Sequence, residues 1–225
     1  MNAMKIKCLD YGSVEVMNST SDGDLLVVNA ARCSFDKEHG EFDEWKDSKL
    51  IHYLAKHGHV LPFRHPVCTL RIHSPLFVLR QLGKHQVGFS WSEVSRRYIT
   101  TFPKFHRPED WRKNADNVKQ GSSEEILDPD IDVQDNYDTA HRYALAAYEE
   151  MLDGGVCPEQ ARMVLPQSMF TTTVTTGSLL GWFHMYRLRT EGHTQKETQE
   201  YAKAVGKVMA ALFPTSWEAL CEHSL

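Results

Sequence analysis

The segment of residues 80–98, RQLGKHQVGFSWSEVSRRY, gathers side chains that suit an anionic ligand better than a protein core. Its basic members are Arg80, Lys84, His85, Arg96 and Arg97. Arginine grips phosphate oxygens in a two-pronged fork, and lysine acts as a point charge. The alternative is a solvated loop after a helix, because short motifs give false positives. Since the whole chain has a net charge of -5, we expect this local cluster to bind a small anion such as a nucleotide.

Two further segments carry basic residues near predicted helix ends. Arg162 stands among apolar neighbours in the string ARMVLP, where an arginine often forms a structural ion pair. Arg189 and His193 are four residues apart, so a continuous helix would turn both toward one ligand. Gly192 and Thr194 favour a break and a new helix start instead, which would make these surface residues at a helix junction.

A strand followed by a helix is predicted to position the first basic segment. Residues 67–73 alternate apolar and polar side chains, which is typical of a half-buried strand. Ser74 and Pro75 then supply an N-cap and a first-turn proline for a helix over residues 76–85. A spacing of three to four residues places three polar side chains on one face of this helix: Gln81, Lys84 and His85.

The remaining pattern mixes strands and helices without regular alternation. It favours an α+β fold with a mixed sheet and packed helices, in a single domain over residues 1–225. Residues 25–28 predict a buried strand, and the threonine run 171–176 predicts an extended segment. Residues 103–136 are polar and predict a long loop or insertion. Helices are predicted over residues 43–57, 137–152, 158–166, 178–189 and 194–212.

Composition restricts the class of protein. The isoelectric point near 6.2 argues against a nucleic-acid coat or a membrane-surface protein. The cysteines are five in number and form no CxxC, which predicts reduced thiols in a cytoplasmic protein. No apolar run reaches the roughly 18 residues of a membrane span, and the first residues do not read as a signal peptide.

Residue types alone leave two other functions open. A metal-dependent phosphohydrolase or nuclease would use some of the 12 histidines. Their spacing matches no HExxH or comparable motif, so we expect no metal. In a single-stranded nucleic-acid-binding protein, aromatic residues between the basic ones would stack on bases: Phe89, Trp91 and Tyr98.

Six strings, in consistent order and spacing, resemble segments of the flavin-dependent thymidylate synthases. They are NAARCSF (29–35), HGHVLPFRHP (57–66), SPLFVLRQLGKHQ (74–86), SEVSRRY (92–98), ARMVLP (161–166) and LRTEGHTQKE (188–197). The resemblance covers most of the chain. Lys84 and Gln86 stand where the family signature has arginines, and Leu61 and Arg64 replace a usual threonine and glutamate.

This resemblance implies an enzyme that makes dTMP from dUMP. Methylenetetrahydrofolate would donate the carbon, FAD would carry the hydride and NADPH would reduce the flavin. A homotetramer is implied, with active sites where subunits meet and with small molecules, not nucleic acid or membrane, as partners. The residues implied to hold dUMP are Gln81, Lys84, Glu93, Val94, Ser95, Arg96, Arg97, Arg162 and Arg189.

The residues implied to lie near FAD are Ser34, Leu61, Lys84, His85, Gln86, Glu93, Ser178, His184 and His193. Arg189 would be catalytic. Placed against the N3/O2 edge of uracil, its charge would stabilise the ionised base and make C5 nucleophilic without a covalent cysteine.

Overall fold

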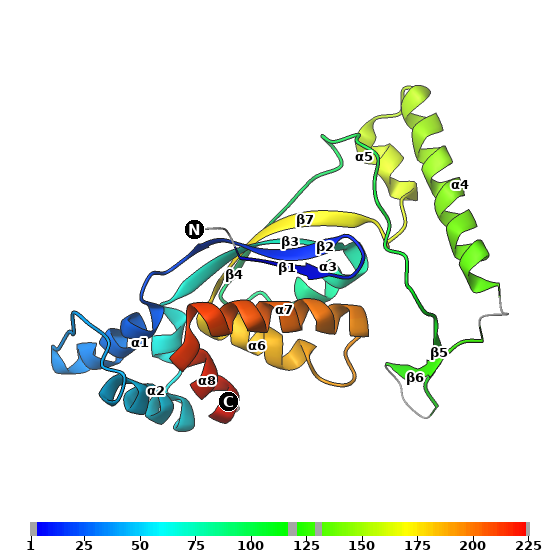
Figure 1. The fold of residues 1–225 in the computed structure, drawn as a ribbon. Coiled ribbons are helices and arrows are strands. Elements are labelled where there is room, and N and C mark those ends of the chain that lie inside the picture. The colour runs from blue at the N-terminus through cyan, green and yellow to red at the C-terminus, as the bar shows by residue number, and fades with distance from the viewer. Residues whose placement is uncertain (1–3, 117–120, 129–131, 224–225) are drawn as a thin grey trace.

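The structure, a computed structural model, describes residues 4–116, 121–128 and 132–223. A five-stranded sheet with the order β1-β2-β3-β7-β4 forms its centre (Figure 1). Every pairing in this sheet is antiparallel. The prediction of an α+β fold is confirmed, but the predicted mixed sheet is wrong, because the described strands pair only in antiparallel fashion. The strands are β1 Lys5–Cys8, β2 Gly12–Ser19, β3 Val67–Pro75, β4 Phe89–Glu93 and β7 Phe170–Ser178.

Helices α6 (Leu179–Arg189) and α7 (Lys196–Leu212) cover one face of the sheet (Figure 1). On that face Leu70 and Ile72 of β3 are fully buried. The opposite face is polar and half-exposed: Thr69 bonds Thr176 there at 2.8 Å. The alternation predicted for residues 67–73 is therefore confirmed, and it separates the core from a face that no described helix covers.

The strand predicted at residues 25–28 is wrong, because these residues lie within helix α1 (Gly23–Arg32). A four-residue apolar run fits a buried strand or a buried helix equally well. Tertiary contacts fix the helix here. The Asp24 carboxylate accepts the backbone N–H groups of Thr215 and Ser216 at 3.0 Å, which ties α1 to the start of α8 (Pro214–His223).

Helix α3 spans Leu76–Leu82, so it ends three residues before the predicted end. The predicted N-cap role of Ser74 is also wrong: strand β3 runs through Pro75, which is itself the N-cap. The first N–H groups of the helix bond instead to the Met169 and Gln167 carbonyls, at 2.9 and 3.1 Å. Carbonyls from a neighbouring segment therefore replace the side-chain cap.

The other predicted helices are confirmed, with shifts of a few residues at their ends. The last begins after Gln195 rather than at Thr194. The observed bounds are α2 Lys46–Lys56, α4 Val133–Asp153 and α5 Pro158–Ala161, and three short 3₁₀ turns are η1 Cys33–Phe35, η2 Leu61–Arg64 and η3 Arg162–Val164. None of the helices in the described ranges is long and apolar enough to cross a membrane.

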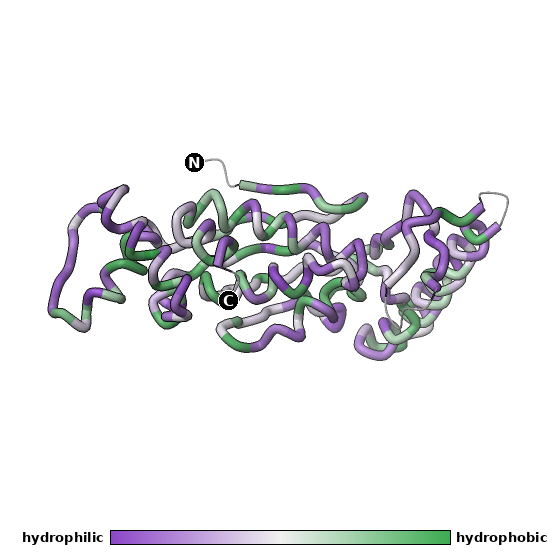
Figure 2. The backbone as a smooth tube through the Cα atoms, turned by 90° about the horizontal axis from the view of Figure 1, so that it is seen from below, coloured by the Kyte–Doolittle hydropathy of each residue, from purple (hydrophilic) through white to green (hydrophobic). Residues whose placement is uncertain are grey.

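Helices α4 and α5 with η3 form an arm that projects from one end of the sheet (Figure 1). Figure 2 shows the same elongated outline, with this arm and the α1–α2 region at opposite ends. Although α4 has 21 residues, Tyr148 is its one buried residue. Residues 103–136, predicted as a loop or insertion, contain the hairpin β5 (Arg112–Asn114) and β6 (Ser122–Ile126) where the structure describes them.

Candidate active site

A cleft of about 820 Å³ opens where the end of α3, the end of α6 and the α6–α7 loop meet the β5–β6 hairpin. Its volume lies in the usual range for small-molecule sites. The structure brings four of the predicted residues together here: Gln81, Lys84, Arg189 and His193. This cleft is the centre of the candidate site.

Arg189 is held by a hydrogen bond from its Nε to Nε2 of His85, at 3.1 Å. The bond requires an unprotonated Nε2, so it assigns the neutral His85 tautomer with the proton on Nδ1. Burial, with the positive charges of Arg189 and His184, lowers the pKa of His85 to about 4. Because no described residue accepts a hydrogen bond from the terminal nitrogens of Arg189, both are available to a planar ligand.

This low pKa predicts an acid-sensitive fold. The folded state resists protonation of His85, whereas the unfolded state takes up the proton near the ordinary pKa of 6.5. The contribution is therefore complete above pH 7 and is lost as the pH falls toward 4. The free energy of unfolding of the wild type should fall more steeply over this interval than that of His85→Gln, measured by urea titration at each pH.

Other histidines should contribute to the acid sensitivity of both the wild type and His85→Gln. Burial also lowers the pKa values of His73, His141 and His184, so the variant should still lose stability in acid, but less steeply. Parallel curves for wild type and His85→Gln would show that His85 is protonated normally in the folded protein.

Basic side chains that form no salt bridge within the described chain line this cleft and continue along α6 to η2. Lys84, Arg64, Arg187 and Arg189 form no salt bridge with any carboxylate in the described ranges. After burial, the charges of Arg187 and Arg64 are the causes that lower the pKa of His184, so η2 and α6 bring these three side chains close together. Unpaired cations in one place favour an anionic ligand, and a dinucleotide pyrophosphate fits that requirement.

Three of the predicted flavin-binding residues lie on elements that adjoin this basic group. Ser34 in η1 and Leu61 in η2 are exposed, as is His184 on α6, and η2 packs against both α1 and α6. Two other predicted residues already have local partners. Ser178 Oγ accepts the Gly181 N–H at 3.1 Å and caps α6, while the Gln86 amide donates to the Gly83 carbonyl in the turn after α3.

The rest of the predicted nucleotide set lies elsewhere. In β4, Phe89 pairs with Gly177 and Glu93 with Thr173, so the strand carries the chain about 13 Å between them. The residues from the end of β4 onward do not line the cleft around Arg189; these are Glu93, Val94, Ser95, Arg96 and Arg97.

The residues at the end of β4 and directly after it form a second group, which is held by hydrogen bonds of its own. Glu93 accepts the Thr171 hydroxyl at 3.1 Å. Ser95 Oγ accepts hydrogen bonds from the backbone N–H and the Nε of Arg97 at 3.3 and 3.4 Å. The chain thus presents Ser95 and Arg97 as a neighbouring pair.

Arg162 lies in η3 on the arm, where it is exposed. Its Nε donates to the Glu159 carbonyl at 3.4 Å, and it forms no salt bridge with the described carboxylates. The structural ion pair considered from the sequence is therefore wrong for the described chain. Arg162 likewise does not line the cleft.

Sequence reasoning missed several residues of the cleft. Arg112 lines it from the β5–β6 hairpin and bonds Glu197 at 2.7 Å. Gln195 accepts the Gln81 side-chain amide at 2.7 Å and so orients it. The string LRTEGHTQKE contains Gln195 and Glu197 and was a usable signal. Nothing in the composition of residues 103–136 indicated Arg112.

The structure does not support the two alternative functions, single-stranded nucleic-acid binding and metal-dependent phosphohydrolase or nuclease activity. Phe89 packs edge-on against Trp182, with ring centroids 4.7 Å apart, and the Trp91 indole donates to the His85 carbonyl. Tyr98 alone of the three proposed stacking residues is exposed. The described histidines of residues 57–73 do not form a three-ligand group. Burial raises the pKa values of the Cys8 and Cys68 thiols to about 12, so these thiols stay protonated and are poor nucleophiles.

Comparison with known proteins gives a consistent result. The sequence model of the family described as "Thymidylate synthase complementing protein" matches residues 15–215. A "Flavin-dependent thymidylate synthase" of Thermus thermophilus is 34% identical over 99% of this chain and 80% of its own length. One from Thermosipho africanus is also 34% identical, over 98% of this chain and 96% of its own. The crystal structure of a UMP/dUMP methylase, PolB from Streptomyces cacaoi bound with 5-Br dUMP, superposes with a TM-score of 0.84 at 29% identity, covering 96% of this chain and 97% of PolB.

Proposed function

Because the chain belongs to the flavin-dependent thymidylate synthases, we propose that it makes dTMP from dUMP at the cleft around Arg189. Methylenetetrahydrofolate donates the carbon, FAD carries the hydride and NADPH reduces the flavin. The observation that carries the proposal is Arg189, held through Nε by a neutral His85. Gln81 and Lys84 line the same cleft.

Arg189 is the catalytic residue of this proposal. Its two free terminal nitrogens form charge-assisted hydrogen bonds with the N3/O2 edge of uracil and stabilise negative charge on the ring. C5 then attacks the one-carbon unit without a cysteine adduct. Lys84 adds a positive charge at the same cleft, and Gln81, oriented by Gln195, supplies an amide for the base.

In this proposal the flavin is held by residues from several segments of the chain. Ser34, the Leu61 backbone, His184 and His193 are all exposed in the folded chain. Neutral His85 offers an N–H donor at Nδ1, and the unpaired cations near His184 suit the pyrophosphate. When bound, reduced FAD supplies the hydride that completes the methyl group.

The nucleotide site is completed by a second copy of the chain. The pair Ser95–Arg97 and Arg162 lie outside the cleft, although dUMP needs a phosphate-binding group. Large apolar side chains are exposed around both: Tyr98 at 77% and Phe102 at 67% beside the pair, and Met163 at 71% on the arm. Exposed apolar surface of this kind marks protein contacts. We therefore propose a homotetramer with active sites where subunits meet, working in the cytoplasm, where free thiols persist.

Arg97→Ala tests the second group directly. Loss of a charge-assisted bond to the dUMP phosphate should weaken dUMP binding by about 1.5–3 kcal/mol, measured by calorimetric titration of the flavin-loaded enzyme. FAD content should be unchanged. Arg142→Ala is the matched control, because Arg142 is also exposed and bonds only Thr139 among described residues. Equal dUMP affinity in both variants would remove Arg97 from the site.

The visible spectrum of the purified protein, followed by an assay of dTMP, tests the function as a whole. The expected protein is yellow, oxidises NADPH faster when dUMP is present, and forms dTMP when methylenetetrahydrofolate is added. A colourless protein that takes up no FAD would contradict the proposal. Nucleic-acid binding with a steep salt dependence would favour the discarded alternative.

A further inference from the structure

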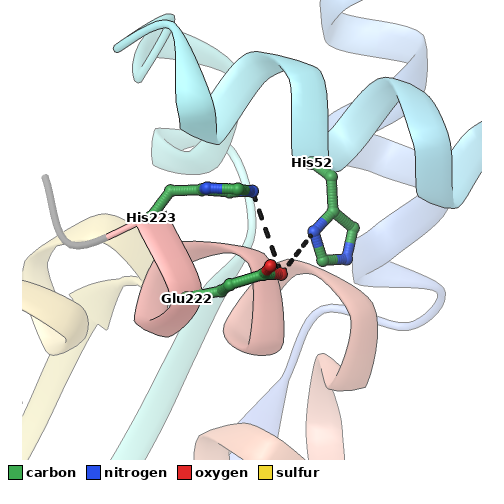
Figure 3. A group of neighbouring side chains, drawn as sticks. All are labelled: His52, Glu222 and His223. Carbon is green, nitrogen blue, oxygen red and sulfur yellow. Dashed lines mark ion pairs between the residues drawn. The ribbon is translucent and has the colours of Figure 1, made fainter.

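We propose that His52, Glu222 and His223 form a zinc-binding site that joins helix α2 to the C-terminal helix α8. His52 comes from α2, and the other two residues end α8. Figure 3 shows both imidazole rings directed at the Glu222 carboxylate from two sides. The group lies outside the candidate active site, and no sequence motif indicated it because His52 stands far from the other two residues along the chain.

The spacing of the donor atoms suits a zinc ion. His52 Nδ1 lies 3.1 Å from Glu222 Oε2, and His223 Nε2 lies 3.9 Å from the same oxygen. The three ligand atoms are all within 4.8 Å of one another. Zinc bonds of about 2.0–2.1 Å with tetrahedral angles separate neighbouring ligand atoms by about 3.3 Å. Small side-chain rotations are therefore enough to bring all three atoms to one ion.

The donor types point to the same ion. Two imidazoles and one carboxylate are a common zinc set, with water in the fourth position. Calcium and magnesium prefer sites made wholly of oxygen. The His52 and His223 side chains are 30% and 19% exposed and Glu222 is 59% exposed. The site is thus partly sheltered and yet open to an ion from solvent.

The two helices hold these ligands on a rigid base. Ile51, Leu54 and Ala55 of α2 are buried in the same hydrophobic core as Trp217 and Leu220 of α8. Ligands on packed helices are better positioned than ligands on loops. An ordinary ion pair between His52 and Glu222 would use the same geometry, so metal binding itself must separate the two interpretations.

The test uses full-length, flavin-loaded enzyme without an affinity tag, freed of metal by dialysis against a chelator. Zinc chloride is then added, bound zinc is measured by elemental analysis after equilibrium dialysis, and unfolding is followed by circular dichroism. We expect one zinc per chain and a melting temperature that rises with zinc concentration. His52→Ala and Glu222→Gln should each weaken zinc binding by about tenfold or more, since loss of even an outer-shell partner costs roughly 10–100-fold.

His57→Ala is the matched control, because His57 is an exposed histidine at the end of the same helix. It should bind zinc as the wild type does. Glu222→Gln keeps the size of an exposed side chain, so it remains informative if His52→Ala folds poorly. Equal zinc affinity in the wild type and Glu222→Gln, or loss of zinc in His57→Ala alone, would overturn the proposal. Neither result depends on dTMP formation, so this test and that of the proposed function can fail separately.

Discussion

Replacing Arg189 with alanine should lower kcat for dTMP formation by about 10²–10³-fold, the loss typical when one donor that stabilises developing negative charge is removed. The protein should remain yellow, because the proposed partner of Arg189 is the pyrimidine and the flavin contacts come from other segments. The measurement is single-turnover dTMP formation together with the flavin absorbance per chain.

Arg189→Lys separates charge from geometry. Lysine keeps the positive charge but has no planar fork, and it cannot make the Nε bond to His85 while it also presents two nitrogens to uracil. We therefore expect it to recover only a small part of the lost rate. Normal dTMP formation by Arg189→Ala would show that the assigned role is wrong. Loss of FAD in parallel with activity would move Arg189 to the flavin site.

At a dUMP concentration well below the weakened Kd of Arg97→Ala, co-expression of this variant with Arg189→Ala should restore activity that neither variant shows alone. In the proposed assembly, each active site takes Arg189 from one chain and Arg97 from another. Random mixing of equal amounts leaves both residues intact in about one quarter of the sites, as expected for contacts between identical subunits. The expected result is therefore about one quarter of the wild-type rate per site.

The control for that experiment is a second mixture, of Lys84→Ala with Arg189→Ala. Lys84 and Arg189 line the same cleft of one chain, so every chain in this mixture has a damaged cleft and no site can be intact. We expect no recovery above the separate variants. Equal recovery in both mixtures would mean that the groups around Arg97 and Arg189 do not divide between chains as proposed.

Much of the fold could be predicted from local pattern. The alternation of residues 67–73 and the long helices near the C-terminus are confirmed, because periodic burial is written into the residues themselves. The strand predicted at residues 25–28 is wrong, since a short apolar run fits either element and the contact of Asp24 with α8 cannot be seen in the sequence. The hairpin of β1 and β2 carried no strong signal of its own.

The candidate site could also be predicted only in part. Gln81, Lys84, Arg189 and His193 belong to quoted strings, and the structure brings them together in one cleft. The separation of residues 93–97 from that cleft required the pairing of β4 with β7, which a sequence does not state. The alternation of Phe89 and Trp91 with Ser90 and Ser92 was in fact a strand signal, but the basic residues around it suggested a continuous anion cradle.

The position of strand β4 also determines which mutations in such a gene could complement each other. The few residues from Phe89 to Glu93 divide one signature into a part that serves its own chain and a part that, in the proposed assembly, serves a neighbour. In that assembly, a substitution among residues 80–86 would damage the subunit that carries it, whereas one among residues 93–97 would damage the site of another. Where two alleles are expressed together, lesions in the two parts would complement each other, and selection would act on the signature as two separate traits.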